Sequence, residues 1–152
     1  MPTTTLSPTI RVEKTGGPEE MRLVDLPVGE PGANEVRIRH HAIGLNFIDV
    51  YQRSGIYPLP LPLSLGNEGA GVIEAVGPGV AHLKAGDRAV YCGGPPGSYS
   101  LARVMPARHA VRLPDAISFE IQPTTANAPF ELWVDDVEFV VDPSKPSPFK
   151  AK

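Results

Sequence analysis

Apolar and polar residues alternate along several short stretches of the chain, and each stretch is closed by glycine or proline. Val36, Ile38 and His40 alternate with charged or polar neighbours, which is the period of a strand with one buried face. Comparable strand patterns cover residues 9–17, 21–28, 69–80, 85–94 and 97–114. The last of these is broken at Pro106. The pattern therefore predicts seven or eight short strands before about residue 114.

One stretch predicts a helix instead. Residues 47–54 follow Asn46, a good N-cap residue, and precede Gly55, the usual C-cap. Asp49 then lies in the first turn, near the positive end of the helix dipole. Residues 57–66 carry prolines at alternate positions, so they must be extended and cannot form a central strand. Many strands and one helix indicate a mainly β barrel or sandwich.

The pattern changes after Phe119. Residues 130–141 alternate and then become almost wholly apolar, which predicts a long or bent strand. They contain the only tryptophan, Trp133, which fits a core or edge-covering residue; stacking on a sugar is the alternative. Residues 142–152 are rich in proline and lysine, and we expect them to be frayed.

Composition narrows the functional classes. A chain of 152 residues with 41% hydrophobic and 20% charged residues is typical of a soluble globular domain. Its net charge of −3 offers no electrostatic footprint for nucleic acid or an anionic membrane. No apolar run approaches the roughly 18 residues that a membrane helix needs, and the first residues lack a secretory signal pattern. We therefore expect a cytoplasmic protein with no nucleic-acid or membrane partner.

Metal and phosphate sites are not predicted. The four histidines and Cys92 lack the short spacings of a zinc site, and His40 and His41 point to opposite faces of a strand. A single cysteine excludes an internal disulfide, and we interpret Cys92 as a buried structural thiol. The glycines of "GAGVIE" and "GPGV" lead into a strand and a turn, so they do not form a dinucleotide loop.

The polar residues around the predicted helix are the candidates for chemistry. Asn46, Asp49 and Tyr51 place an amide, a carboxyl and a phenol within six residues. Together they suit a polar, amide-bearing ligand such as the nicotinamide ribose. The same residues also suit a capped surface helix without a ligand, and from the residues alone both interpretations stay open.

Three stretches resemble a known family: "AIGLNFIDVYQRSGIYP", "GNEGAGVIEAVGPGVAHLKAGDRAVY" and "GSYSLARVMPARHAVRLPDAISFE". Their order, spacing and residues are similar to the zinc-free quinone oxidoreductases of the medium-chain dehydrogenase/reductase superfamily, over about residues 9–120. The resemblance implies the family's N-terminal catalytic domain, a GroES-like, partly open β-barrel with one short helix. It also implies NADPH-dependent reduction of quinones.

The resemblance carries residue roles with it. In zinc-bearing relatives a cysteine stands where this chain has Asn46 and a histidine where it has Asn67, so the resemblance implies zinc-independent chemistry. It implies catalytic positions at Asn46, Asp49 and Tyr51. It implies contacts to the nicotinamide cofactor at Asn46, Tyr51, Tyr57 and Glu68. In the family these side chains line the cleft where the nicotinamide meets the quinone.

The resemblance ends near residue 120, and the family's Rossmann domain has no counterpart in the residues that follow. Residues 121–141 instead resemble the last strand of a carbohydrate-binding β-sandwich module. We therefore expect a chimera: an incomplete oxidoreductase domain in 1–120, a heterologous closing strand in 121–141 and a flexible tail in 142–152. We expect no NADPH binding and no turnover by this chain alone. The alternatives are NADPH:quinone oxidoreductase activity and carbohydrate binding, and an exposed cleft face or strand exchange would favour a homodimer.

Overall fold

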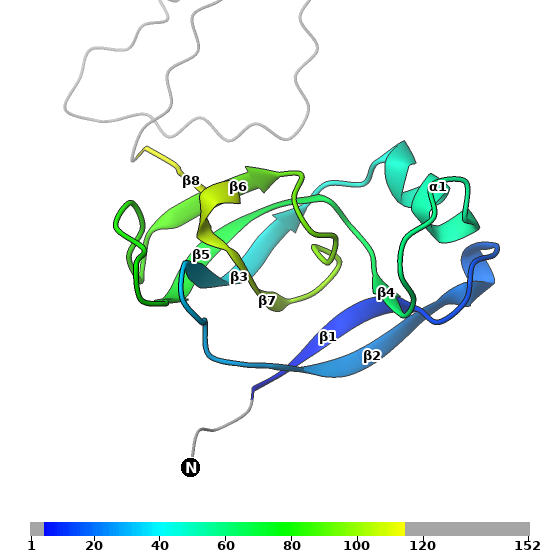
Figure 1. The fold of residues 1–152 in the computed structure, drawn as a ribbon, viewed down its shortest axis with the longest axis horizontal. Helices are drawn as coiled ribbons and strands as arrows, with labels where there is room; N and C mark the ends of the chain where they lie inside the picture. The colour runs from blue at the N-terminus through cyan, green and yellow to red at the C-terminus, as the bar shows by residue number, and fades with distance from the viewer. Residues whose placement is uncertain (1–4, 115–152) are drawn as a thin grey trace, which may run out of the picture. The chain divides into compact units, whose positions relative to one another are not determined.

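The computed structural model describes residues 5–114, which form two antiparallel sheets and one helix (Figure 1). The strands are β1 (Thr5–Val12), β2 (Met21–Val28), β3 (Glu35–Ile43), β4 (Leu63–Ser64), β5 (Glu68–Val76), β6 (Arg88–Cys92), β7 (Ala102–Pro106) and β8 (Val111–Arg112). The helix α1 spans Phe47–Ser54, and short 3-10 turns cover Pro18–Glu20 and Ala107–His109. The mainly β fold with one short helix is thus confirmed.

The strands divide into a smaller and a larger sheet. The smaller sheet has the order β2-β1-β4 and the larger one β7-β3-β5-β6-β8. The predicted strand at 21–28 is confirmed, whereas the strand predicted at 9–17 is shifted, because β1 pairs with β2 from Thr5 to Val12. As the alternate prolines of residues 57–66 predict, that stretch contributes only the two-residue edge strand β4.

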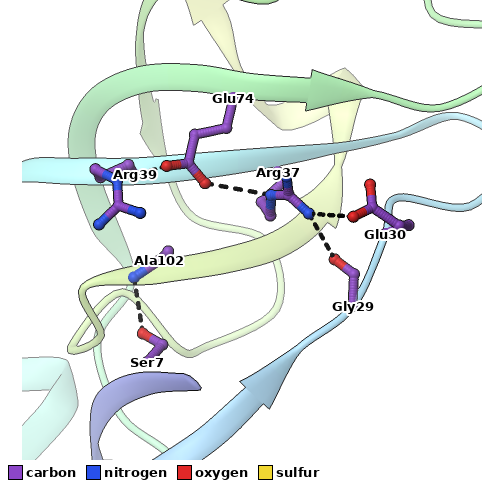
Figure 2. A network of polar contacts seen from close by, with 7 residues as sticks. All are labelled: Ser7, Gly29, Glu30, Arg37, Arg39, Glu74 and Ala102. Atoms are coloured by element: carbon purple, nitrogen blue, oxygen red, sulfur yellow. Dashed lines mark hydrogen bonds and ion pairs between the residues drawn. The ribbon is translucent and has the colours of Figure 1, made fainter. Parts of the chain in front are cut away.

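The segment 97–102 joins the two sheets. The Ile10 N–H of β1 donates to the Tyr99 carbonyl over 2.8 Å. At the start of β7, the Ala102 N–H donates to the Ser7 hydroxyl oxygen over 2.8 Å (Figure 2). Backbone pairing therefore fixes the position of Tyr99 relative to β1, and this position matters for the site below.

The main core lies on one face of the larger sheet. Val36 and Ile38 are fully buried, and His40 is nearly so, which confirms the predicted alternation along β3. Ile73 of β5 and Met105 of β7 pack into the same cluster, together with Leu83, Ala89, Tyr91, Ala107 and Ala110. A second, smaller cluster of Val12, Leu63 and Leu65 lies near the smaller sheet, with Ile10, Leu59 and Tyr99 packed against it.

The opposite face of β3 carries charged side chains. Arg37 donates from Nε to Glu74 over 3.2 Å and from Nη1 to Glu30 over 2.8 Å and to the Gly29 carbonyl (Figure 2). Arg39 donates to the other oxygen of Glu74. The hydrogen bond with Glu30 raises the pKa of Arg37 above its usual value. This network keeps one face of the larger sheet polar. The buried apolar residues of β3 therefore point to the opposite face, toward the core.

Some predictions fall on other parts of the chain. The strand predicted at 130–141, with Trp133, lies outside the described residues, and so do the segments 121–141 and 142–152. Among residues 5–114, no helix has the length and apolar character needed to cross a membrane.

Candidate functional site

Helix α1 buries polar side chains and exposes apolar ones. Asp49 is 4% exposed and Gln52 and Arg53 are also buried, whereas Phe47 is 80% exposed and Val50 is exposed as well. A surface helix normally has the reverse arrangement, with apolar residues facing the core. Polar interactions therefore hold α1 against the sheets, and its apolar side faces outward.

The ends of α1 agree with the sequence. Asn46 is the N-cap residue, and its backbone N–H donates to the Asp49 carboxyl over 2.9 Å, as in a capping box. Gly55 ends the helix in the left-handed conformation, with a φ of 86°, and its N–H donates to the Gln52 carbonyl. Both predicted caps are confirmed.

The Asp49 carboxyl group lies at the centre of a hydrogen-bond network. Its Oδ2 accepts from the Asn46 N–H over 2.9 Å and from the Tyr99 hydroxyl over 2.7 Å. Its Oδ1 accepts from the Asn67 side-chain amide over 2.6 Å. Burial raises the pKa of Tyr99, and the hydrogen bond to Asp49 raises it further. Tyr99 therefore remains a protonated donor at physiological pH.

Two further contacts extend this network. The Asn46 side-chain amide donates to Glu68, and the Glu68 side chain lies over Gly44, where a Cβ atom would come within 2.4 Å of it. Gln52 and Asn67 also contact each other through their amides, over 3.2 Å. The structure thus brings Asn46, Asp49 and Glu68 together from α1, its N-terminus and β5.

Tyr51 and Tyr57 form a separate pair. Their ring centroids are 5.3 Å apart in an edge-to-face arrangement, and the Tyr57 N–H donates to the Tyr51 carbonyl. Both rings are accessible, with Tyr51 37% and Tyr57 53% exposed. The resemblance assigned five residues to the cleft. Three of them, Asn46, Asp49 and Glu68, form one hydrogen-bonded cluster. The other two, Tyr51 on α1 and Tyr57 in the loop after it, form an exposed aromatic pair.

An apolar groove runs beside α1 next to the network. Leu45, Phe47 and Val50 line it from the helix side, and Met21 and Tyr99 from the sheet side. Its volume is about 430 Å³, and Asn46 and Asp49 are also among its lining residues. The site therefore combines amide and carboxyl groups with an accessible apolar wall, which suits a flat, partly polar organic ligand.

Comparison with known proteins identifies the fold family. Residues 32–115, more than half of the chain, match the family described as the alcohol dehydrogenase GroES-like domain. The chain belongs to this family.

Its relatives include several quinone oxidoreductases. The GroES-like domain is 55% identical over 106 residues to the quinone oxidoreductase of Pseudomonas aeruginosa. The aligned residues make up 69% of this chain and 33% of that protein. It is 49% identical over 112 residues to quinone oxidoreductase 1 of Escherichia coli strain K12, covering 73% of this chain and 34% of the relative. The chain thus spans about a third of the length of these relatives.

Solved structures give the same result. The Escherichia coli quinone oxidoreductase in complex with NADPH superposes with a TM-score of 0.70 at 47% identity, over 74% of this chain and 35% of that one. The quinone oxidoreductase of Pseudomonas syringae pv. tomato has a TM-score of 0.70 at 50% identity over the same shares. The GroES-like, partly open barrel that the resemblance implies is confirmed.

One sequence interpretation is wrong. Cys92 is exposed and not buried, because alternation along β6 turns its neighbour Tyr91 into the core. Cys92 pairs directly with Glu68 of β5, so the two side chains share one face of the sheet. His40 is buried and His41 is exposed, which confirms that they point in opposite directions. Within residues 5–114 there is no group of three or more possible metal ligands.

Sequence reasoning missed part of the network in the GroES-like domain. Tyr99 and Gln52 were not proposed for the site, and Asn67 entered only as the position of an absent zinc ligand. The only signal in the sequence is that "GNEG" and "GSYS" contain polar residues beside glycines. Nothing local shows that these segments meet α1.

His40 provides a titratable group behind the site. Its Nδ1 lies 2.6 Å from the Ser100 carbonyl oxygen, which can only accept, so Nδ1 carries the proton. Its Nε2 lies 2.8 Å from the Tyr91 hydroxyl and accepts from it. Burial lowers the pKa of His40, the Ser100 carbonyl opposes this, and the positive charge of Arg103 lowers the pKa further. His40 is therefore held neutral.

This environment predicts a pH-dependent stability. Since the folded-state pKa of His40 lies below the unfolded value of 6.5, the unfolded chain binds more protons between the two values. The contribution of His40 to the free energy of unfolding is complete above about pH 6.5. It falls as the pH drops toward the folded-state pKa, by at most about 1.4 kcal/mol per pH unit. Urea unfolding at a series of pH values measures this decline.

The neighbouring histidine supplies the control. We expect His40→Gln to lose this part of the decline, whereas His41→Gln keeps it because His41 is exposed. Equal pH profiles for the wild-type chain and His40→Gln would contradict the assignment.

Proposed function

We propose that this GroES-like domain is the catalytic domain of an NADPH-dependent quinone oxidoreductase. The observation that carries the proposal is the inverted helix α1. Its buried Asp49 holds Asn46 and Asn67 in place, while its outer side presents Tyr51 and an apolar groove. The 55% identity to a quinone oxidoreductase supports the same reaction class.

The side chains suit the nicotinamide end of NADPH. A nicotinamide is a flat aromatic ring with a carboxamide, and Asn46 and Glu68 offer an amide and a carboxyl in direct contact with each other. The exposed rings of Tyr51 and Tyr57 offer aromatic surface and two hydroxyl groups. The Escherichia coli relative was solved in complex with NADPH, which supports this choice of cofactor.

In this proposal the protein acts by positioning and by hydrogen bonding. NADPH, when bound, supplies a hydride to the quinone, and a proton from water completes the hydroquinone. Asn46 and Glu68 orient the reacting ring against the quinone. Tyr51 and Tyr57 donate hydrogen bonds to the quinone oxygen, where negative charge develops during the reaction. Asp49 is buried and both of its oxygens already accept hydrogen bonds, so in this proposal it acts by holding Asn46 and Asn67.

We propose this reaction for the domain. How the isolated chain behaves is a separate prediction. The five side chains that the resemblance assigns to the cleft carry amide, carboxyl and phenol groups, and Arg53, which also lines the groove, donates to the Gly16 carbonyl. The expectation that the chain alone neither binds NADPH nor reduces quinones therefore stays a prediction. Carbohydrate binding rests on residues outside the described range, and a homodimer also stays a prediction.

A domain transplant tests the proposed function. Residues 9–114 of this chain replace the matching segment of the Pseudomonas aeruginosa quinone oxidoreductase, and NADPH oxidation by a quinone is followed at steady state. We expect an active chimera, and we expect Asn46→Ala within it to lower kcat/KM by about 10–100-fold, as loss of a positioning contact does. The exposed Val111→Ala substitution is the control and should keep the activity. A folded chimera that binds NADPH but does not reduce quinone would sink the proposal.

A titration tests the isolated chain. NADPH is added to the full chain while nicotinamide fluorescence is recorded, and a quinone is added at the end. We expect no saturation at micromolar NADPH and no oxidation, from a chain that still unfolds cooperatively. Saturable binding followed by turnover would show that the prediction for the isolated chain is wrong.

A further inference from the structure

Tyr99 is held rigidly between the two sheets. Its N–H donates to the Leu65 carbonyl over 2.9 Å, and its carbonyl accepts from the Ile10 N–H over 2.8 Å. Its ring packs against the smaller apolar cluster, which includes Val12 and Leu65. Gly66 makes room for this packing, because a Cβ atom at that position would come within 2.4 Å of the Tyr99 ring. Both the backbone and the ring of Tyr99 are therefore fixed.

The Tyr99 hydroxyl transmits this fixed position to Asp49. It donates to Oδ2 over 2.7 Å, while Asn67 donates to Oδ1 over 2.6 Å. Within the described residues, the ion pairs of the chain do not include Asp49. Neutral donors alone then balance a buried carboxyl group, so the loss of one donor leaves an oxygen partly unsatisfied and removes one of the three contacts that orient the group.

Asp49 in turn holds two amides, that of Asn46 in the proposed cleft and that of Asn67 beside it. It accepts from the Asn46 N–H, which fixes the first turn of α1, and from the Asn67 side chain. The Asn46 side chain points from that turn to Glu68. A change in the orientation of the Asp49 carboxyl would therefore move both amides.

We infer that Tyr99 is a positioning residue of the cleft: its hydroxyl locks the Asp49 carboxyl and thereby the amides of Asn46 and Asn67. The predicted effect of Tyr99 on ligand binding rests on the proposed function, whereas its predicted effect on the two amides does not. Tyr99 reaches no reacting atom in this role.

Tyr91 offers a matched comparison. Its hydroxyl likewise donates to a side chain, His40, over 2.8 Å, and the residue is buried. Its hydroxyl makes no contact with Asp49 among the hydrogen bonds of the described residues. The substitutions Tyr99→Phe and Tyr91→Phe each remove one hydrogen-bonded hydroxyl and keep the ring, so they separate a positioning effect from a general loss of stability.

The experiment uses the full chain labelled with nitrogen-15. The NMR signals of the Asn67 and Asn46 side-chain amides report their hydrogen bonds, and thermal unfolding reports stability. Duroquinone is the ligand probe, because its fully substituted ring resists addition of the exposed Cys92 thiol. We expect Tyr99→Phe to shift both amide signals, to speed water exchange at Asn67 about tenfold, and to weaken duroquinone binding several-fold. We expect Tyr91→Phe to lower the melting temperature similarly and to leave the amides and the affinity unchanged.

Each outcome decides a separate point. Unchanged Asn67 and Asn46 signals in Tyr99→Phe, or equal changes in Tyr91→Phe, would overturn the positioning role. A wild-type chain that does not respond to duroquinone would overturn the predicted effect of Tyr99 on ligand binding in the isolated chain, while the amide comparison would still decide its effect on Asn46 and Asn67. The proposed function is tested separately, by the domain transplant. Should Tyr99→Phe fail to unfold cooperatively, Asp49→Asn replaces it. That variant removes an acceptor and should produce the same amide changes at Asn67.

Discussion

The buried carboxyl group of Asp49 is the interaction on which the site depends. It is 4% exposed, and three donors reach it: a backbone N–H of the helix start, an amide from the segment before β5 and a phenol from the segment before β7. These donors come from parts of the chain 3, 18 and 50 residues away. A single side chain thus joins α1 to the segments that precede β5 and β7, two strands of the larger sheet. Removing it would leave several polar groups buried without a partner, which costs about 1–3 kcal/mol each.

This constraint explains why α1 is inverted. A short helix of eight residues has little stability of its own, so its attachment must come from tertiary contacts. Here polar contacts of Asp49 and Gln52 provide the attachment, and the apolar side of the helix is left free. The exposed Phe47 and Val50 then form the wall of a groove instead of a core. The same arrangement that fixes the helix creates the surface that we assign to ligand binding.

The sequence predicts what depends on neighbours along the chain. Alternation along β3 and the caps at Asn46 and Gly55 follow from local chemistry, and the structure confirms them. The family resemblance correctly identified the GroES-like fold. The partners Gln52 and Tyr99 could not be predicted, because their contacts depend on how separate strands pair. Cys92 was misjudged for a related reason, since the face to which it points depends on which residue of β6 enters the core.

The central claim is that Asp49 and Asn67 are energetically coupled and hold α1 in place. A double-mutant cycle of Asp49→Ala and Asn67→Ala, with urea unfolding at pH 7, measures this coupling directly. We expect Asn67→Ala to lose about 1–3 kcal/mol and Asp49→Ala to lose more, because three donors then lose their acceptor. The double variant should lose clearly less than the sum of the two, with a coupling energy of about 1–3 kcal/mol. Additive losses, within about 0.5 kcal/mol, would show that the two side chains act independently and would contradict the account.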